Sequence, residues 1–219
     1  AGGKTLIQMS WERCKESNAD EVIVITDSDE IFRHISDLGG EAFISTTSHD
    51  SGTDRVQEYA KTAGLEAQEV VINVQGDEPL IDIEAVNQLG DFMHVNKYKY
   101  GTIAQHFSSN TDLLDPNKVK VVLNDDNSAI EFFRDAPIVV KDFSKVVLHH
   151  VGIYAYQVDF LHTFAGLCKT KNELNLKLEQ MRALDNALPL HVLELNLDES
   201  WGIDTEEDLI RLRKHLELN

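Results

Sequence analysis

Cysteine and proline are scarce in this chain of 219 residues, which has two cysteines and four prolines. Cys14 and Cys168 are far apart and neither belongs to a CxxC pair, so the sequence offers no disulfide framework and no cysteine zinc site. Few, isolated cysteines are typical of a reducing compartment, and we expect a cytoplasmic protein. Because no Pro- or Gly-rich linker and no internal repeat divides the chain, we expect a single domain over residues 1–219.

Long hydrophobic runs and concentrated positive charge are also missing. No apolar run approaches the roughly 20 residues that span a bilayer, and the N-terminal stretch has no signal-peptide core, so membrane insertion is not expected. Thirty-eight acidic residues outnumber twenty basic ones, which gives a formal net charge of −18. The densest basic group, within residues 211–214, follows three acids on the same predicted helix. Nucleic acid is therefore not an expected partner.

What the chain does contain is an alternation of helix and strand signals through its first half. β-branched apolar runs predict buried strands, and helical spacing with caps predicts helices between them. The predicted strands are 21–27, 41–45 and 69–75. The predicted helices are 5–19, 28–40, 52–64 and 82–95. This order predicts an α/β fold with a mostly parallel central sheet flanked by helices, whose ligands bind at the carboxyl ends of the strands.

The second half changes to a mixed pattern. Turn residues between short apolar runs favour antiparallel strands there. The predicted strands are 99–107, 118–125, 129–134, 149–157 and 190–196. The predicted helices are 158–167, 171–186 and 206–218. We therefore expect a smaller mixed part, at roughly 99–160, on the same sheet.

Two acids follow apolar segments in places where an α/β sheet builds its sites. Asp77 comes directly after the strand at 69–75, and Asp204 follows another apolar segment. Two such carboxylates could share a hard divalent cation, which prefers oxygen ligands. The alternative for Asp204 is purely local, since Thr205 and Asp208 have capping-box spacing and would start a helix in any protein. The two roles are compatible, and both stay open.

Five stretches together carry a family resemblance: VINVQGDEPLI, SHDSGTDRVQEYA, HHVGIYAY, KLEQMRALDN and WGIDTEEDL. In these stretches the chain resembles the 3-deoxy-manno-octulosonate (Kdo) cytidylyltransferases, also called CMP-Kdo synthetases. The resemblance implies a Rossmann-like nucleotidyltransferase fold with a mixed dimerisation part, and hence a homodimer. It implies cytidylyl transfer from CTP to Kdo, which gives CMP-Kdo and pyrophosphate for lipopolysaccharide synthesis.

The resemblance also implies roles for individual residues. Mg²⁺ would be held by Asp77 and Asp204. Gln75 would lie near both substrates as a third catalytic residue. The nucleotide would be met by Ser51, Gly52, Arg55 and Gln75. The acid sugar would be met by Arg134, His150, Tyr154, Glu179 and Gln180. The match at Arg134 is imperfect, because Phe133 stands where the family usually has serine.

The N-terminal end departs from the family pattern. The spacing between Gly3-Lys4 and Thr26-Asp27 matches the family's second Gly-Lys, so the resemblance implies that the first strand and its basic triphosphate loop are absent from the sequence as given. That loop supplies lysine, arginine and backbone amides to the phosphates. The 219 residues alone are then expected to bind CTP very weakly.

Other classes of protein stay open. Asp27-Ser28-Asp29 has the DxD pattern of metal-dependent glycosyltransferases. A dinucleotide-binding oxidoreductase is disfavoured because no GxGxxG follows the early strand. A noncatalytic dimerisation module is the third alternative. Among acid sugars, the sequence does not separate Kdo from 8-amino-Kdo or a sialic-acid-like substrate.

Overall fold

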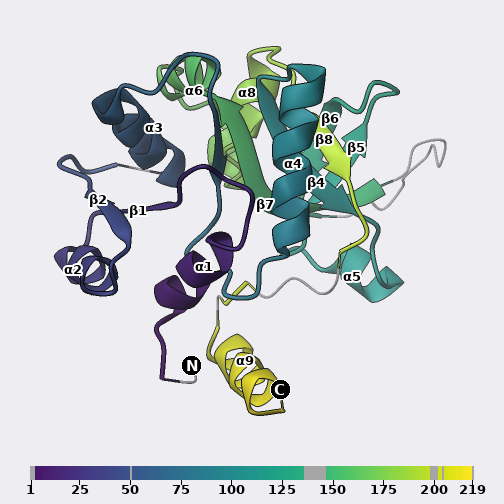
Figure 1. Ribbon diagram of the computed structural model, residues 1–219. Helices are drawn as coiled ribbons and strands as arrows, with labels where there is room; N and C mark the ends of the chain where they lie inside the picture. Colours follow the sequence, from purple (N-terminus) through teal and green to yellow (C-terminus); the bar gives the residue numbers. More distant parts are fainter. Residues whose placement is uncertain (1–2, 50, 136–146, 198–201, 204, 219) are drawn as a thin grey trace. The chain divides into compact units, whose positions relative to one another are not determined.

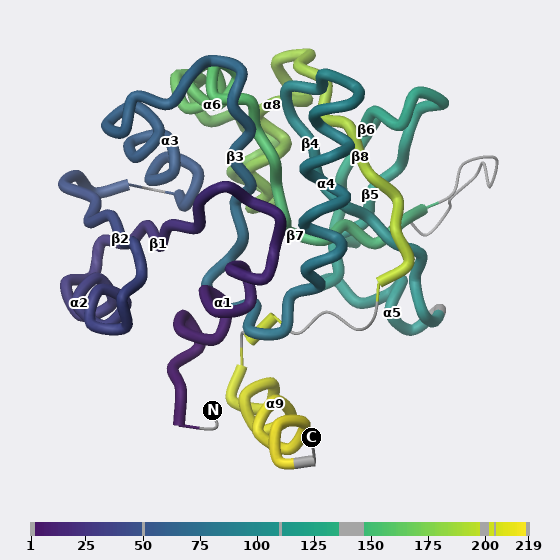
Figure 2. Tube along the Cα trace, in the orientation of Figure 1, coloured from purple at the N-terminus to yellow at the C-terminus, as the bar shows by residue number. Residues whose placement is uncertain are grey.

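A computed structural model describes residues 3–49, 51–135, 147–197, 202–203 and 205–218 (Figures 1 and 2). The chain forms two compact units, each built from segments that are far apart in sequence. Unit 1 comprises residues 1–65, 73–88 and 197–219, and unit 2 comprises residues 66–72 and 89–196. The single domain expected over residues 1–219 stays a prediction.

Unit 1 contains a small parallel sheet of β1 (Ile23–Thr26) and β2 (Glu41–Ile44). Its helices are α1 (Leu6–Cys14), α2 (Asp29–Asp37), α3 (Gly52–Ala63) and α9 (Glu206–Leu218). α2 packs beside both strands (Figure 2). Trp11, Val24 and Ile35 form a buried apolar cluster. Gly40 is required beside it, since a Cβ there would lie 2.5 Å from the indole ring of Trp11.

The helices of unit 1 begin where the sequence offers capping side chains. Thr5, Ser28 and Ser51 each accept a hydrogen bond from a backbone N–H in the first turn of α1, α2 and α3. α3 ends at Gly64, whose φ of 70° is the left-handed conformation that glycine adopts without strain. These local signals explain why the predicted helix starts agree with the observed ones, whereas the helix predicted over 5–19 ends earlier, at Cys14.

Unit 2 is built on a six-stranded sheet in the order β6-β5-β7-β4-β8, with β3 also paired to β7. The strands are β3 (Val70–Asn73), β4 (Tyr100–Gln105), β5 (Lys120–Leu123), β6 (Ala129–Phe133), β7 (Val147–Gln157) and β8 (His191–Glu194). β7 runs antiparallel to β4 and to β5, β5 runs antiparallel to β6, and β8 runs parallel to β4. Long β7 is therefore the strand that organises the sheet.

The described helices of unit 2 are mostly short. They are α5 (Asn110–Leu114), α6 (Val158–Ala165), α7 (Lys171–Leu176), α8 (Met181–Asp185) and the C-terminal half of α4 (Ile83–Asn96). α4 lies across one face of the sheet over β4 (Figure 1). The contact is close, because a Cβ on Gly101 would lie 2.5 Å from the sulfur of Met93.

The α/β class is confirmed, and two details differ from the sequence prediction. The large sheet is more mixed than a mostly parallel one, with three antiparallel pairings and one parallel pairing among those with described registers. The predicted helix at 171–186 is wrong as one element. It divides into α7 and α8 because Lys177 adopts the left-handed conformation (φ 54°) and ends the first helix. α5 was not predicted.

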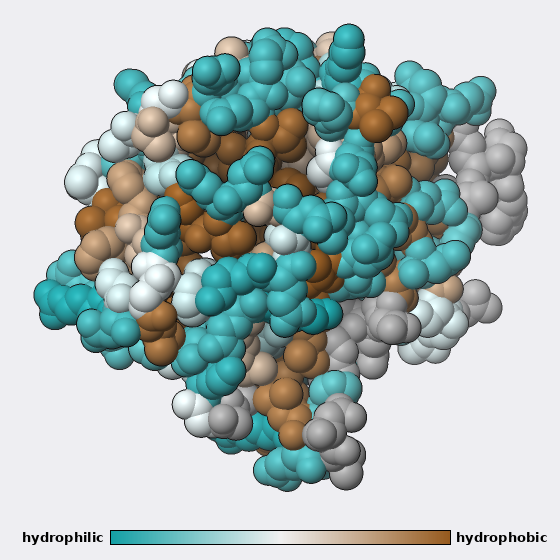
Figure 3. Space-filling model, in the orientation of Figure 1, coloured by the Kyte–Doolittle hydropathy of each residue, from teal (hydrophilic) through white to brown (hydrophobic). Residues whose placement is uncertain are grey.

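Hydrophilic residues cover most of the face drawn in Figure 3, with hydrophobic residues between them. In the part of the chain that the structure describes, no helix combines the length and the hydropathy needed to cross a membrane.

Candidate functional site

Asp77, a predicted metal ligand, lies in unit 1, in the turn that follows β3. After the strand, the chain turns, and the Glu78 N–H donates to the Gln75 carbonyl at 3.3 Å. The Ser10 hydroxyl fixes the turn by donating to the Gly76 carbonyl at 2.9 Å. Gln75 and Asp77 are exposed. Among the described residues, the carboxylate of Asp77 has neither an ion pair nor a hydrogen bond, so it is available to a ligand.

A segment from the other end of the chain lies against this turn within unit 1. The Ile203 N–H donates to the Asp77 carbonyl at 3.1 Å. A Cβ on Gly202 would lie 3.1 Å from a carboxylate oxygen of Glu78. Asp204 itself lies outside the described residues. The structure thus brings the residue before Asp204 into direct contact with Asp77.

The capping role expected after Asp204 is confirmed. The Asp208 N–H donates to the Thr205 hydroxyl at 3.2 Å, and the Thr205 N–H donates to the Asp208 carboxylate at 3.0 Å. This reciprocal pair starts α9. Because the cap uses Thr205 and Asp208, the helix start does not need the side chain of Asp204.

Three of the four predicted nucleotide-binding residues, Ser51, Gly52 and Arg55, lie at the N-terminal end of α3 in unit 1, whereas Gln75 lies in the turn after β3. Ser51 caps the helix and accepts from the Asp54 N–H at 3.2 Å. Among the described residues, a Cβ on Gly52 would meet only the Asn73 side-chain amide, at 3.9 Å, so none of them fills the space beside this backbone. Helix N-termini attract phosphates through their partial positive charge. The arrangement suits a phosphate-bearing ligand that approaches Gly52 closely.

Arg55 and the DxD segment are linked by an ion pair. An Arg55 guanidinium nitrogen lies 3.1 Å from the Asp27 carboxylate. Ser28 caps α2, and Asp29 stands in its first turn, where a negative charge is favourable. Each residue of the DxD segment therefore has a structural role, which argues against the metal site of a glycosyltransferase.

His150 is buried on β7 in unit 2 beside Thr102. The Thr102 hydroxyl donates its single proton to a backbone carbonyl, that of Ile153 at 2.7 Å. The His150 Nε2, 3.0 Å from the same hydroxyl, must then carry the proton and donate. Burial lowers the pKa of His150 to about 3. The imidazole is therefore neutral, with Nδ1 as an acceptor.

Tyr154 and Gln180 belong to the same side-chain cluster as His150. The rings of His150 and Tyr154 lie 5.4 Å apart, and the Tyr154 hydroxyl donates to the Gln180 side-chain oxygen at 3.0 Å. Burial raises the pKa of Tyr154 well above its usual range. Gln180 is only 2% exposed, and its amide nitrogen has no hydrogen-bond partner among the described residues. An unpartnered buried donor suits a ligand oxygen.

Glu179 and Arg134 complete the predicted sugar-binding set. A Glu179 carboxylate oxygen lies 4.0 Å from the Arg182 guanidinium, next to Gln180. Arg134, which was predicted to contact the carboxylate of the sugar, binds backbone carbonyls of unit 2. Its guanidinium donates to three backbone carbonyls, at 2.8 Å to Leu176 and at 3.4 Å to Pro116 and Lys177, so among the described residues two of its five N–H donors have no hydrogen-bond partner. Its role as a carboxylate contact stays a prediction.

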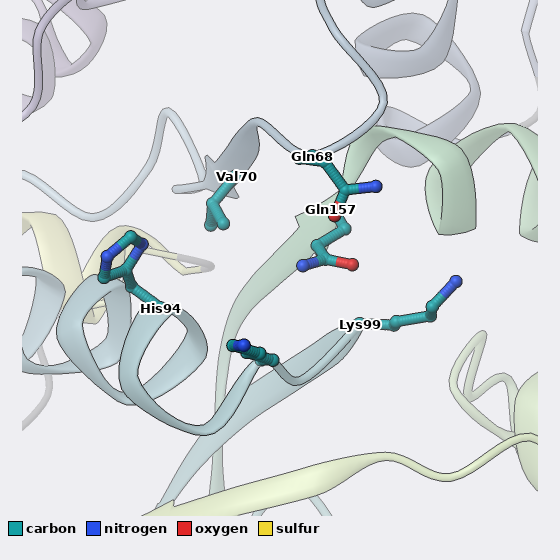
Figure 4. Close-up of a pocket in the computed structure, with 6 residues that line it drawn as sticks. Gln68, Val70, His94, Lys99 and Gln157 are labelled. Atoms are coloured by element: carbon teal, nitrogen blue, oxygen red, sulfur yellow. The ribbon is translucent and has the colours of Figure 1, made fainter.

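A cavity of about 510 Å³ opens elsewhere in unit 2 (Figure 4). It is lined by Gln68, Val70, His94, Lys97, Lys99 and Gln157. Figure 4 shows the amides of Gln68 and Gln157 close together, with His94 on the other side. The Lys99 ammonium is already paired with Asp159 at 2.6 Å. The cavity contains none of the predicted site residues.

Within the described ranges, no group of three or more His, Cys, Asp or Glu side chains is placed to hold an ion. The Mg²⁺ prediction, with Asp204 outside those ranges, stays a prediction.

Acid should destabilise unit 2 through His150. Its pKa is about 3 in the folded chain and near 6.5 when unfolded, so below pH 6.5 the unfolded state binds a proton that the folded state refuses. The free energy of unfolding should fall by about 1.4 kcal/mol per pH unit between pH 6.5 and 4.5 from this group. Urea unfolding across that range measures the slope. His150→Gln keeps a donor for Thr102 and should remove this part of the slope, leaving the similar contribution of His149, whose pKa burial lowers to about 4; an unchanged slope would assign the effect to other groups.

Comparison with known proteins places this arrangement in a family. The sequence profile described as "Cytidylyltransferase" matches residues 2–192. A solved structure of CMP:2-keto-3-deoxy-manno-octonic acid synthetase complexed with CTP superposes with a TM-score of 0.89 at 31% identity, covering 99% of this chain and 89% of that one. Fold and profile together define a cytidylyltransferase of the nucleotidyltransferase α/β class, as the resemblance implied.

Individual relatives identify the particular family of cytidylyltransferases. The 3-deoxy-manno-octulosonate cytidylyltransferase of Saccharophagus degradans is 37% identical over 228 residues, which cover 98% of this chain and 89% of the relative. That of Thermodesulfovibrio yellowstonii is 39% identical, with 94% and 86% covered. The chain belongs to the 3-deoxy-manno-octulosonate cytidylyltransferase family.

Proposed function

We propose that the protein transfers the cytidylyl group of CTP to 3-deoxy-manno-octulosonate and so supplies lipopolysaccharide synthesis. The sugar's anomeric hydroxyl attacks the α-phosphorus, the bond to the β-phosphate breaks, and pyrophosphate leaves as the hydroxyl proton is lost. The main demands on the protein are alignment and neutralisation of phosphate charge. The observation that carries the proposal is the hydrogen bond between Ile203 and Asp77, which joins two segments that the family resemblance assigns to one metal site.

Mg²⁺ belongs to this proposal, with Asp77 and Asp204 as its ligands. The exposed carboxylate of Asp77, which has no partner among the described residues, fits a hard cation that takes oxygen ligands and keeps several waters. When bound, the ion would offset negative charge on the triphosphate. Gln75, two residues before Asp77 on the same turn, would lie beside the ion.

The two substrates would use different side chains. Ser51, Gly52 and Arg55 would bind the nucleotide at the N-terminus of α3, where Arg55 is oriented by Asp27. The acid sugar would meet the cluster on β7 and α8. There, neutral His150 offers an acceptor, and buried Gln180 offers an amide donor that has no partner among the described residues. A donor and an acceptor in one cluster, linked through Tyr154, suit sugar hydroxyls.

The proposal also includes the oligomeric state and the cellular location. We propose homodimerisation through the mixed part at roughly 99–160, which the family resemblance supports, and a cytoplasmic location, which the scarcity of cysteine supports. They fit an enzyme whose substrates are a nucleotide and a free acid sugar.

Pyrophosphate release by the full-length protein tests the activity. With CTP and Mg²⁺, Kdo should support turnover at least tenfold above 8-amino-Kdo or a sialic acid, a difference of about 1.4 kcal/mol in transition-state binding. A preference for another acid sugar would correct the substrate while keeping the chemistry. Stabilisation by a UDP-sugar and none by CTP would contradict the proposal and restore the glycosyltransferase alternative.

A further inference from the structure

Glu58 on α3 collects an unusual number of hydrogen bonds from one loop. Residues 45–49 connect β2 to the start of α3, and five of their donor groups point at this carboxylate. One oxygen accepts from the N–H and the hydroxyl of Thr46, at 3.1 and 2.8 Å. The other accepts from the hydroxyls of Ser45 and Thr47 and from the imidazole of His49, at 2.6 Å for His49.

These contacts saturate the carboxylate and keep it charged. Two carboxylate oxygens offer about four lone-pair sites, and five donors use all of them. The hydrogen bonds from Ser45, His49 and Thr46 lower the pKa of Glu58 to about 2, with that of Ser45 the strongest. Both Glu58 and His49 are largely enclosed, with 16% and 17% of their side chains exposed. The pair is part of a built cluster, and neither side chain extends freely into solvent.

The loop has little else to hold it. Its residues are small and polar, and loops of that kind keep much of their conformational freedom unless hydrogen bonds fix them. Ser45 continues from β2 and donates its N–H to the Thr26 carbonyl at 2.7 Å. Within the described residues, the hydrogen bonds of Thr46 go to Glu58, and those of Thr47 and His49 join each other or Glu58, apart from one that the Thr47 carbonyl accepts from the Ser45 hydroxyl at 3.2 Å. Glu58 is therefore the anchor of the loop.

The loop leads directly into the predicted nucleotide site. His49 lies two residues before Ser51, which caps α3, and Glu58 lies on the same helix as Arg55. Because Glu58 is on α3, its hydrogen bonds hold residues 45–49 in a fixed position relative to Ser51 and Gly52 at the start of this helix. All of these residues belong to unit 1.

We infer that Glu58 is a positioning residue for the nucleotide: by holding residues 45–49, it preorganises the entrance to α3 before CTP binds. The inference rests on the proposed function. A loop that is ordered in advance loses less entropy on binding, which strengthens binding without a new contact to the ligand. Its effect should appear in nucleotide affinity and leave the chemical step and the sugar site unchanged.

Glu58→Gln in the full-length protein tests this. The variant loses the charge and turns one acceptor oxygen into a donor, so the KM and the dissociation constant for CTP should rise about tenfold, while kcat and the KM for the acid sugar stay within twofold. Hydrogen exchange at the amides of residues 46–49 should quicken. Thr46→Val removes one hydroxyl bond and should shift CTP binding the same way by a smaller factor, and its effect should largely vanish in the Glu58→Gln background.

Asp126→Asn is the matched control. Asp126 also accepts from a backbone N–H and a hydroxyl, those of Ser128 at 3.0 and 2.6 Å, but it lies in unit 2. It should leave CTP affinity unchanged. Equal CTP affinity in wild type and Glu58→Gln, with faster exchange in the loop, would overturn the inference and leave the proposed function intact. Absence of CTP binding by the wild type would instead refute the proposed function.

Discussion

Asp77→Asn is expected to lower kcat/KM at least a hundredfold while changing the free energy of unfolding by no more than about 0.5 kcal/mol. The two effects separate because Asp77 takes part in the fold through its backbone carbonyl, which accepts from Ile203, and asparagine keeps that carbonyl. The side chain is exposed and unpartnered within the described chain, so little stability depends on it. Its charge matters only when a cation and phosphates are present.

Kinetics over a range of Mg²⁺ concentrations measure this effect. If the lost charge weakens metal binding, the variant should need more Mg²⁺ for half-maximal rate, and excess Mg²⁺ should restore part of the activity. Asp20→Asn, an exposed acid of the same unit, is the control and should behave as wild type. Wild-type kcat/KM in Asp77→Asn would remove the metal site from the proposal. A large loss of stability would show instead that the side chain holds the turn.

The sequence predicted the helices of unit 1 well because their boundaries are set by adjacent residues. Ser28 and Ser51 cap helices that follow immediately, and Gly64 ends one by adopting a positive φ. Such signals act within one turn and need no tertiary context. The division of the predicted helix at 171–186 had no comparable signal, since Lys177 is an ordinary helix former that the surrounding packing places in the left-handed region.

Part of the proposed metal site could be predicted because it depends on the order of the helices and strands. Asp77 stands at a strand end, which the order of elements reveals, and the contact from Ile203 agrees with the expected pairing of the two segments. Glu58 was missed because its importance comes from five donors that converge in space, although the five consecutive polar residues of 45–49 could have raised the question of what satisfies them. The hydrogen bonds from Arg134 to backbone carbonyls could not be predicted from the sequence either, because they depend on how two distant turns meet.

The second large effect concerns a buried ion pair that supports the proposed sugar-binding side chains. Arg182 and Glu173 are 2% and 7% exposed, and they form two hydrogen bonds, of 2.9 and 2.6 Å. The guanidinium also lies 4.8 Å from the ring centre of Phe164. Glu173 in turn accepts the Thr170 N–H at 3.1 Å, which starts α7. One pair thus ties α7 to α8, the helix that follows Gln180.

Arg182→Met should lower the free energy of unfolding by about 3–5 kcal/mol, because methionine fills much of the space but leaves the carboxylate of Glu173 buried without its partner. Urea unfolding measures the loss. The double variant Glu173→Met/Arg182→Met removes both charges and should recover most of the stability, since the main penalty is one uncompensated buried charge. Lys99→Met, which breaks an exposed pair with Asp159, should change stability by less than about 1 kcal/mol. If Arg182→Met were no more harmful than Lys99→Met, water would have to reach Glu173, and the pair would be a surface contact rather than a support for α8.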